Sequence, residues 1–219
     1  MRRFLMAAAL GLGGGSACGQ VLTSVADLGP AVQTRAIADM GEQIDNLPTP
    51  NSVLGVNRVR YSNDLFEVRA IDEPVPNDSV YGLLSRNPGN DLISNVARFP
   101  FPPFAQPGIE IIFSKPVEAF GFFSLTGTRS TPREVLFYDE SGDLIDSITY
   151  TSTTNGRQEV FVGLRSVGRL IARIELVDTR EDFASSPSAI AGPDFYLVIP
   201  SPGAAGLAMV GLVAVRRRR

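Results

Sequence analysis

The chain has no histidine and no tryptophan, and it has a single cysteine, Cys18, among its 219 residues. The absence of histidine excludes Ser-His-Asp and Cys-His nucleophile systems, and with only one cysteine it also excludes the usual zinc sites. General acid and base chemistry is then left mainly to carboxylates, and sequence spacing alone cannot show whether two of them meet in space. We therefore expect a protein that is not an enzyme.

Basic residues are scarce in the body of the chain. Six of the 20 basic residues are arginines within the first three and the last four positions. All 23 acidic residues lie between them, so the body carries a net charge of −9. Binding to a phosphate backbone needs clustered Lys and Arg, which this acidic body lacks. We expect no nucleic acid partner.

The N-terminal residues 1–20 have the pattern of a secretory signal peptide. Two arginines precede an apolar stretch from Phe4 to Leu12, and small residues follow from Gly13 to Gly19. This three-part pattern is that of a cleaved export signal, and we expect cleavage between Ala17 and Val21. The mature chain then has no disulfide, so its core alone must hold the fold together.

Cys18 also has a second interpretation, as a lipidated residue. The stretch "GGSAC" resembles a bacterial lipoprotein signal, although the leucine usual three positions upstream is Gly15 here. The simpler interpretation is an ordinary residue near the cleavage site. Both interpretations stay open.

The chain ends in a short apolar segment and four arginines. A helix from Ala204 to Val215 would rise about 18 Å, which is less than the ~30 Å hydrocarbon core of a bilayer. Starting at Phe195 gives an apolar run of about 21 residues, but Pro200 and Pro202 would break that helix. We expect a short C-terminal transmembrane helix that leaves the body outside the membrane, with arginines on the cytoplasmic side. This membrane stop consists of Arg216, Arg217, Arg218 and Arg219.

A Pro-containing motif, a weakly apolar helix and a terminal arginine cluster together resemble the PEP-CTERM sorting signal of Gram-negative bacteria that make extracellular polysaccharide. The motif here is Pro200, Ser201, Pro202 and Gly203, with Ser201 in place of the central Glu of the family. The resemblance implies an exosortase-type transpeptidase as a partner. It also implies a transient stay in the inner membrane, followed by delivery to the cell envelope or the extracellular polysaccharide. The alternative is a plain C-terminal anchor that nothing cleaves.

Between the two ends the hydrophobic periodicity is that of strands. Short runs rich in β-branched and aromatic residues alternate with turn-forming residues, which is typical of an antiparallel sandwich or barrel. In the last run Leu170, Ala172, Ile174 and Leu176 should face the core, because strand side chains alternate between faces. The clearest runs are Gly108 to Phe113, Val117 to Phe123, Glu134 to Asp139, Leu144 to Tyr150, Glu159 to Gly163 and Arg169 to Leu176.

The first half is less regular but compatible with the same fold. Runs at 52–62, 65–71, 79–85 and 92–99 are candidate strands, and the only candidate helix lies within Thr23 to Ile44. We expect an all-β fold, an antiparallel jelly-roll-like β-sandwich with an N-terminal signal segment and a short C-terminal transmembrane helix. The domain boundaries are 1–20 for the signal peptide, 21–45 for an N-terminal segment, 46–199 for the sandwich and 200–219 for the sorting or anchor segment.

The stretch "YDESGDL" is the best candidate for a metal site. It places Asp139 and Asp143 around a Ser-Gly pair, and calcium prefers several oxygen ligands from a tight, Gly-containing turn. The spacing differs from that of the twelve-residue calcium loop, so a solvated hairpin turn is the favoured interpretation. "DTRED" at 178–182 is a similar but weaker candidate. We expect no cofactor, with calcium left as the one alternative.

The segment from about residue 105 to 199 resembles the extracellular β-sandwich often found ahead of PEP-CTERM tails, whose shape is similar to carbohydrate-binding jelly rolls. It contains Phe113, a "PVEAFGF" stretch, a "VLFYDESGDL" hairpin and Asp194 before the last strand. Two functions follow: a non-enzymatic structural or adhesive surface protein, or a carbohydrate-binding module with or without calcium. A sugar-stacking face could use aromatics that otherwise fill the core. Those aromatics are Tyr61, Tyr81, Phe101, Phe104 and Tyr150.

Overall fold

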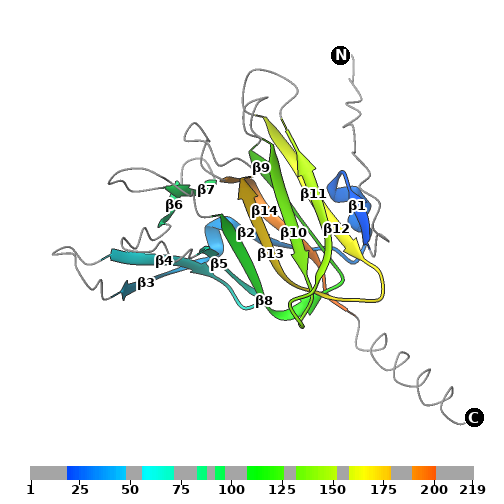
Figure 1. The fold of residues 1–219 in the computed structure, drawn as a ribbon, viewed down its shortest axis with the longest axis horizontal. Helices are drawn as coiled ribbons and strands as arrows, with labels where there is room; N and C mark the ends of the chain where they lie inside the picture. Colours follow the sequence, from blue (N-terminus) through cyan, green and yellow to red (C-terminus); the bar gives the residue numbers. More distant parts are fainter. Residues whose placement is uncertain are drawn as a thin grey trace, which may run out of the picture.

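A computed structural model gives the arrangement of the chain (Figure 1). It describes residues 19–47, 56–71, 83–87, 92–96, 108–125, 132–151, 158–178 and 189–200. Within these ranges the fold is all-β, with two antiparallel sheets and two short 3-10 turns, η1 (Val25–Leu28) and η2 (Ile37–Asp39).

The first sheet, sheet A, has the strand order β1-β12-β9-β14-β7-β6, and β2 also pairs with β14. Both β7 and β2 lie along the same side of β14, at different positions along its length. Its strands are β1 (Gly19–Leu22), β2 (Gln33–Ala36), β6 (Leu83–Asn87), β7 (Leu92–Val96), β9 (Ala119–Leu125), β12 (Glu159–Ser166) and β14 (Ala189–Val198).

The second sheet, sheet B, has the strand order β11-β10-β13-β8-β5-β4-β3. All of its pairings are antiparallel. Its strands are β3 (Gly41–Leu47), β4 (Val56–Ser62), β5 (Phe66–Ala70), β8 (Ile109–Val117), β10 (Arg133–Tyr138), β11 (Leu144–Tyr150) and β13 (Ile171–Asp178).

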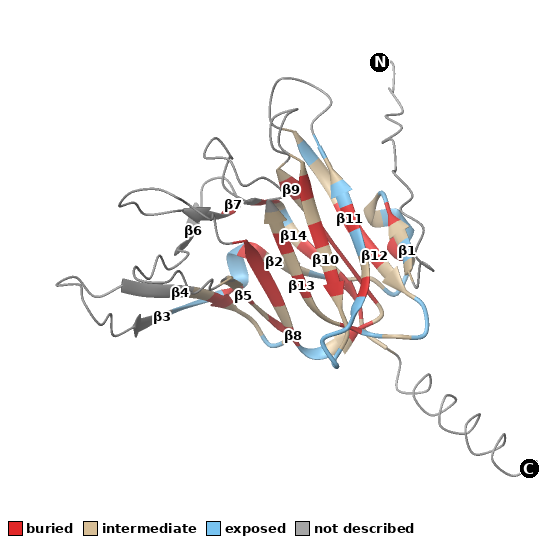
Figure 2. Ribbon diagram, viewed as in Figure 1, coloured by how far each residue is buried: buried red, intermediate tan, exposed pale blue. Residues whose placement is uncertain are grey.

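The main core lies between the two sheets, as the buried stripes in Figure 2 show. Alternating residues of each strand point inward. In β10, for example, buried and half-buried residues alternate along the whole strand. Phenylalanines from both sheets meet at the centre: the rings of Phe66 and Phe195 have centroids 5.0 Å apart, and those of Phe113 and Phe120 are also 5.0 Å apart, both edge-to-face. Such rings bury large apolar areas in favourable geometry, which suits a chain without tryptophan or disulfide.

The strands from β8 to β14 run back and forth along the sandwich and define its two ends (Figure 1). At the turn end, short connections join β8 to β9 at residue 118, β10 to β11 at residues 139–143, and β12 to β13 at residues 167–170. At the far end, longer connections join β9 to β10, β11 to β12 and β13 to β14. The two ends therefore differ in the length of their connections, which are short at the turn end and longer at the far end.

The predicted all-β fold with two antiparallel sheets packed as a sandwich is confirmed. The predicted runs in the second half coincide with β8 to β13, and β11 has the predicted bounds, Leu144–Tyr150. The predicted inward position of Leu170 is wrong, since Leu170 is exposed and Ile171 is buried instead. A register shift between Ile171 and Arg173 against β8 explains the difference, because a β-bulge reverses the alternation of faces.

The predicted helix within Thr23 to Ile44 is also wrong. This segment forms η1, β2, η2 and most of β3, and it follows directly on β1. Asp27 stabilises the first turn, because its Oδ2 accepts hydrogen bonds from the backbone N–H groups of Thr23 at 2.8 Å and Ser24 at 2.9 Å. Residues 19–47 thus contribute strands to both sheets, so the N-terminal segment expected over 21–45 is part of the sandwich.

The remaining predictions about the two chain ends lie outside the described residues. These include the signal peptide up to residue 18 with Cys18, the tail from Ser201 onward and the arginine cluster. Gly19 and Gln20, the last two residues of the expected signal segment, lie in β1. Among the helices that the structure describes, none is long and apolar enough to cross a membrane.

Candidate functional site

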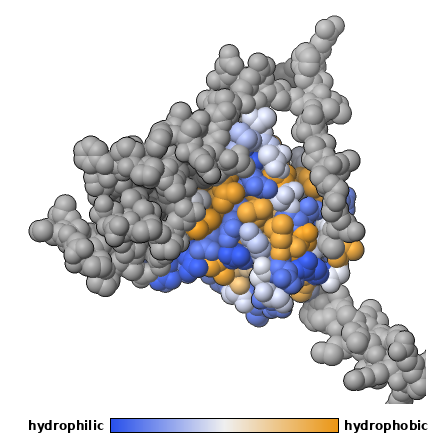
Figure 3. Space-filling view, viewed as in Figure 1, coloured by the Kyte–Doolittle hydropathy of each residue, from blue (hydrophilic) through white to orange (hydrophobic). Residues whose placement is uncertain are grey.

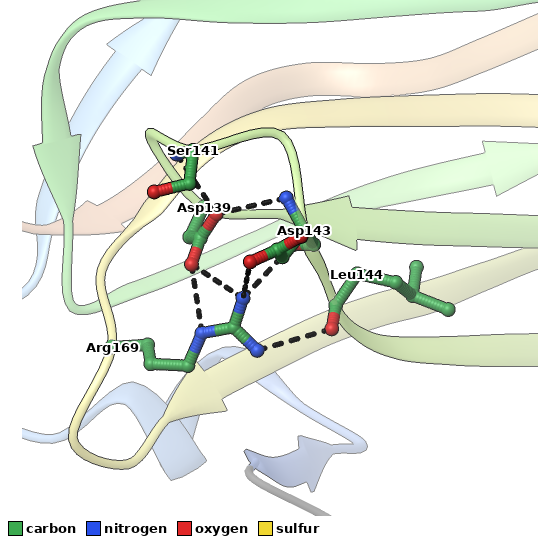
Figure 4. Close-up of polar contacts among 5 residues, drawn as sticks. All are labelled: Asp139, Ser141, Asp143, Leu144 and Arg169. Carbon is green, nitrogen blue, oxygen red and sulfur yellow. Dashed lines mark hydrogen bonds and ion pairs between the residues drawn. The ribbon is translucent and has the colours of Figure 1, made fainter.

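The predicted metal loop forms a closed hairpin turn between β10 and β11 (Figure 4). The Gly142 N–H donates to the Asp139 carbonyl at 3.0 Å, and Gly142 has a φ of 81°. This left-handed conformation favours glycine, which explains why the stretch needs its Ser-Gly pair. The Asp139 carboxylate accepts from the backbone N–H groups of Ser141 at 2.9 Å and Asp143 at 3.0 Å, and so stabilises the turn.

A guanidinium from another turn binds the same carboxylate. Arg169, between β12 and β13, donates Nε–H to Asp139 Oδ2 at 2.8 Å and also donates Nη2–H to it. It further donates to the backbone carbonyls of Leu144 at 3.1 Å and Asp143 at 3.2 Å. The hydrogen bond from Arg169 holds the pKa of the Asp139 carboxyl below its usual value.

This geometry supports the hairpin interpretation of the turn. A cation at Asp139 would have to displace the Arg169 guanidinium, which already compensates the carboxylate. The Asp143 carboxylate lies 3.9 Å from Arg169 and is mostly exposed. Across the described ranges, no group of three or more His, Cys, Asp or Glu side chains could hold a metal ion.

Of the other predicted site residues, few lie within the described residues. Pro200 lies two residues after the end of β14, and the rest of the sorting motif falls outside. The side chains of "DTRED" also fall outside, as do Tyr81, Phe101 and Phe104. Tyr61 is buried in the main core and Tyr150 packs against it, so both act as core aromatics.

Sequence reasoning missed a charged network on the outer face of sheet B. Arg69 Nε lies 2.5 Å from Glu110 Oε1, and Arg60 Nη1 lies 3.1 Å from Glu67 Oε2. On β13, Arg173 Nη1 lies 2.5 Å from Glu175 Oε1. These pairs lie on β4, β5, β8 and β13, so each of these charged side chains has a neighbour of opposite charge. Figure 3 shows such a mixed surface, with hydrophilic and hydrophobic residues side by side.

Two carboxylates stand directly opposite each other within this network. Glu110 on β8 and Glu175 on β13 are cross-strand partners, and Glu110 is only 7% exposed. Glu175 also accepts a hydrogen bond from the Tyr138 hydroxyl at 3.0 Å, and the Arg173 guanidinium lies 4.2 Å from the centre of the Tyr138 ring. Burial and this hydrogen bond raise the pKa of Tyr138. Each of these two carboxylates therefore binds an arginine, Glu110 through Arg69 and Glu175 through Arg173.

The outer face of sheet A carries an apolar patch. Leu22, Leu28, Ala119 and Val198 form a small second core there, covered by the N-terminal segment with β1 and η1. Next to it lie three half-buried aromatic rings. The Phe123 ring packs edge-to-face against the Phe161 ring, with centroids 5.4 Å apart, and against the Tyr196 ring, with centroids 6.3 Å apart. The three rings, called here the aromatic cluster, are Phe123, Phe161 and Tyr196.

Glycines make room for this aromatic cluster. A Cβ at Gly121 would clash with the Phe161 ring, and a Cβ at Gly163 would lie 3.1 Å from the same ring and 2.9 Å from the Phe120 carbonyl. The Phe161 ring thus shields the backbone of two central strands where no side chain could fit. The aromatic cluster thus packs against the backbone of sheet A on its inner side and is half-exposed to solvent on its outer side.

The far end of the sandwich holds a buried polar group of side chains. Arg133 begins β10 and is 1% exposed, although it lies on the same inner face as Val135 and Phe137. Nearby, the Tyr150 hydroxyl donates to Ser124 Oγ at 2.6 Å and so links sheet B to sheet A. Arg133 and Tyr150 are cross-strand partners on β10 and β11.

Comparison with known proteins adds little to this description. No protein-family model matches the chain, and no curated protein matches it in sequence. Among solved structures, one match is the enzymatically active domain of tailspike protein 4 of bacteriophage CBA120, with 12% identity and a TM-score of 0.23. The match covers 76% of this chain but only 18% of that chain, and a likeness this distant carries no argument about function.

Proposed function

We propose that this chain is an exported β-sandwich protein of the cell surface or extracellular matrix, sorted by an exosortase-type system and acting in a non-enzymatic structural or adhesive role. The observation that carries the proposal is where the last strand ends. Strand β14 ends at Val198, and the sorting-like segment begins at Pro200 with almost no linker. The sandwich would therefore stand directly on its own sorting segment.

The strand order supports an extracellular scaffold. Strands β7 to β14 follow the orders β12-β9-β14-β7 in sheet A and β11-β10-β13-β8 in sheet B, which is the order of an eight-stranded jelly roll. A jelly roll holds its shape through a closed core and leaves its ends and outer faces for contact with other molecules. The predicted family of surface proteins would use the fold in this way.

The pairing of the carboxylates supports a non-enzymatic role. Glycosidic bond hydrolysis needs one carboxyl group that can deliver a proton. The cross-strand partners Glu110 and Glu175 each bind an arginine, and Asp139 binds Arg169. In these contacts the carboxylates hold strands and turns together.

The experiment that tests this proposal is the intact mass of the mature protein, purified separately from the cell envelope and from the culture fluid. We expect a C-terminus between Pro200 and Gly203 and an N-terminus near residue 18. Survival of Arg216 to Arg219 on every mature molecule would contradict sorting by a transpeptidase and leave a plain anchor. The same spectrum would show a lipid on Cys18.

The second candidate function is carbohydrate binding, which the aromatic cluster favours. Phe123, Phe161 and Tyr196 leave ring surface partly exposed on a flat sheet face, and sugar rings pack against such surfaces. A glycan that binds only the native state raises the melting temperature by mass action. We would compare wild type with Tyr196→Ala against a panel of polysaccharides, with and without calcium; a shift in wild type alone would favour this function.

A further inference from the structure

The largest exposed apolar side chains gather at the turn end. Leu144 is 49% exposed, Val167 is 66% exposed and Leu170 is 37% exposed, and these are the exposed large hydrophobic residues within the described ranges. Leu144 follows the β10–β11 turn, and the other two belong to the β12–β13 turn. Figure 2 shows exposed residues along these turns. Scattered exposed hydrophobics need no explanation, but three at one tip point to a contact.

Arg169 fixes these tips relative to one another. It precedes Leu170 in the chain and donates to the Leu144 carbonyl at 3.1 Å, so it joins the two turns (Figure 4). Gly168 has a φ of 79° and permits the tight turn that exposes Val167. The Arg169 contact thus holds the backbones of the two turns that carry these apolar side chains next to each other.

The chain also enters and leaves the sandwich at this end. Gly19, the first residue of β1, pairs with Ser166, and Val198, the last residue of β14, pairs with Ala119. Glu118 ties these together, since its N–H donates to the Val198 carbonyl at 2.9 Å and its carbonyl accepts from the Ser166 N–H at 2.9 Å. Both termini of the described sandwich therefore lie beside the exposed turns.

The apolar tail segment that begins at Ala204 starts only four residues after Pro200. Even a fully extended chain spans at most about 14 Å over four residues. If this segment lies in a membrane, the turn end cannot be more than that distance from the bilayer surface. We propose that the turn end rests on the lipid bilayer while the tail is inserted, with Leu144, Val167 and Leu170 in the interfacial region. This inference depends on the proposed insertion of the tail.

The charge of the turn end defines the kind of contact. Glu140 and Asp143 are exposed there, and Lys115 is the exposed basic side chain near the end of β8. Acidic groups do not attract an anionic lipid surface, so the apolar side chains must provide the contact. Three side chains give weak, reversible binding that needs the tail as a tether. Removal of the tail would then release the domain from the membrane.

The absence of tryptophan makes the test direct, because one introduced tryptophan is the only one in the chain. We would place the full chain, with its tail, in phosphatidylcholine vesicles as Val167→Trp, and compare it with Glu159→Trp. Glu159 is exposed at the far end, opposite Leu125. We expect a blue-shifted emission and quenching by brominated phosphatidylcholine for Val167→Trp, and quenching only by aqueous acrylamide for Glu159→Trp. Leu170→Trp serves as a second reporter on the same end.

The outcomes separate this inference from the proposed function. If neither variant floats with the vesicles, the tail does not insert and the proposed function fails. If both float and their quenching is equal, the tail inserts but the turn end does not touch lipid, which overturns the inference alone. A contact that appears only with added phosphatidylglycerol would also overturn it, since the contact would then be electrostatic. So would a blue shift without vesicles that grows with protein concentration, because that indicates contact between copies.

Discussion

The two ends of the sandwich break the usual pattern of burial in opposite directions. The far end buries a charge, because Arg133 is 1% exposed between the sheets, whereas the turn end exposes Val167 to 66%. Charged groups are almost never fully buried unless they are paired, and clusters of exposed apolar side chains often mark sites of interaction. One end thus holds a charged side chain inside the core, and the other presents apolar side chains to solvent.

Polar contacts at the two ends differ in the same way. At the far end, Arg133 interacts with neighbouring residues and Tyr150 binds Ser124 between the sheets. At the turn end, Asp139 and Arg169 join two turns at the surface. A buried polar contact is costly to break, because the group that remains has neither its partner nor water to bind. At the surface, water replaces the lost partner at little cost.

The largest expected effect is that of Arg133→Ala, which should lower the free energy of unfolding by about 3 kcal/mol, because it removes a fully buried side chain together with its contacts and leaves a cavity between the sheets. Urea denaturation measures the loss. Arg169→Ala at the turn end is the matched control, and we expect a clearly smaller loss there. Arg133→Met, which retains the apolar stem, should lose less than Arg133→Ala and covers the case in which the latter does not fold. Equal losses for both arginine-to-alanine variants would remove the contrast between the ends.

Next in size is Tyr150→Phe, which deletes the hydroxyl that links the two sheets. We expect a loss of about 1 kcal/mol in the free energy of unfolding, the usual net contribution of such a hydrogen bond. A double-mutant cycle with Ser124→Ala tests the contact, since the two losses should not add. Tyr138→Phe, on the outer face, should cost less. Additive losses would mean that the two side chains act independently.

A third and smaller effect concerns the pH dependence of the turn end. The pKa of Asp139 is lowered in the folded protein by Arg169, so the unfolded chain binds a proton more readily than the native state does. The stabilisation is therefore complete above the unfolded pKa of about 3.9 and is lost as the pH falls below it. Melting temperatures from pH 7 to pH 2 should fall less steeply for Asp139→Asn than for wild type. Parallel curves would contradict a stabilising role for this contact.

The sequence predicted those parts of the fold that depend on neighbouring residues. Strand β11 and the turn before it follow from alternating side chains and from an Asp-Glu-Ser-Gly stretch, and both are local signals. The same stretch gave the candidate metal residues, but their environment depends on Arg169, 30 residues away from Asp139. No spacing rule indicates that an arginine in one turn binds an aspartate in another.

Register explains most of what the sequence could not predict. Glu110 and Glu175 become neighbours only because β8 and β13 pair with one particular alignment, and a one-residue shift of either strand would turn the glutamate of that strand inward. The exposure of Leu170 has a similar cause, since the bulge at the start of β13 reverses the expected face. Burial of Arg133 follows from its position in line with Val135 and Phe137, which alternation alone could have indicated.

The smallest expected effect on stability comes from the exposed turn residues themselves. Val167→Ser combined with Leu170→Ser should change the free energy of unfolding by no more than about 0.5 kcal/mol, because exposed side chains lose little water on folding. Ile171→Ser is the matched control, and its buried side chain should make it strongly destabilising. Exposed side chains that the fold does not need, in turns beside the first and last described strands, are what the proposed membrane contact requires. A large loss of stability in the double variant would instead assign these residues to the folding of the turn end.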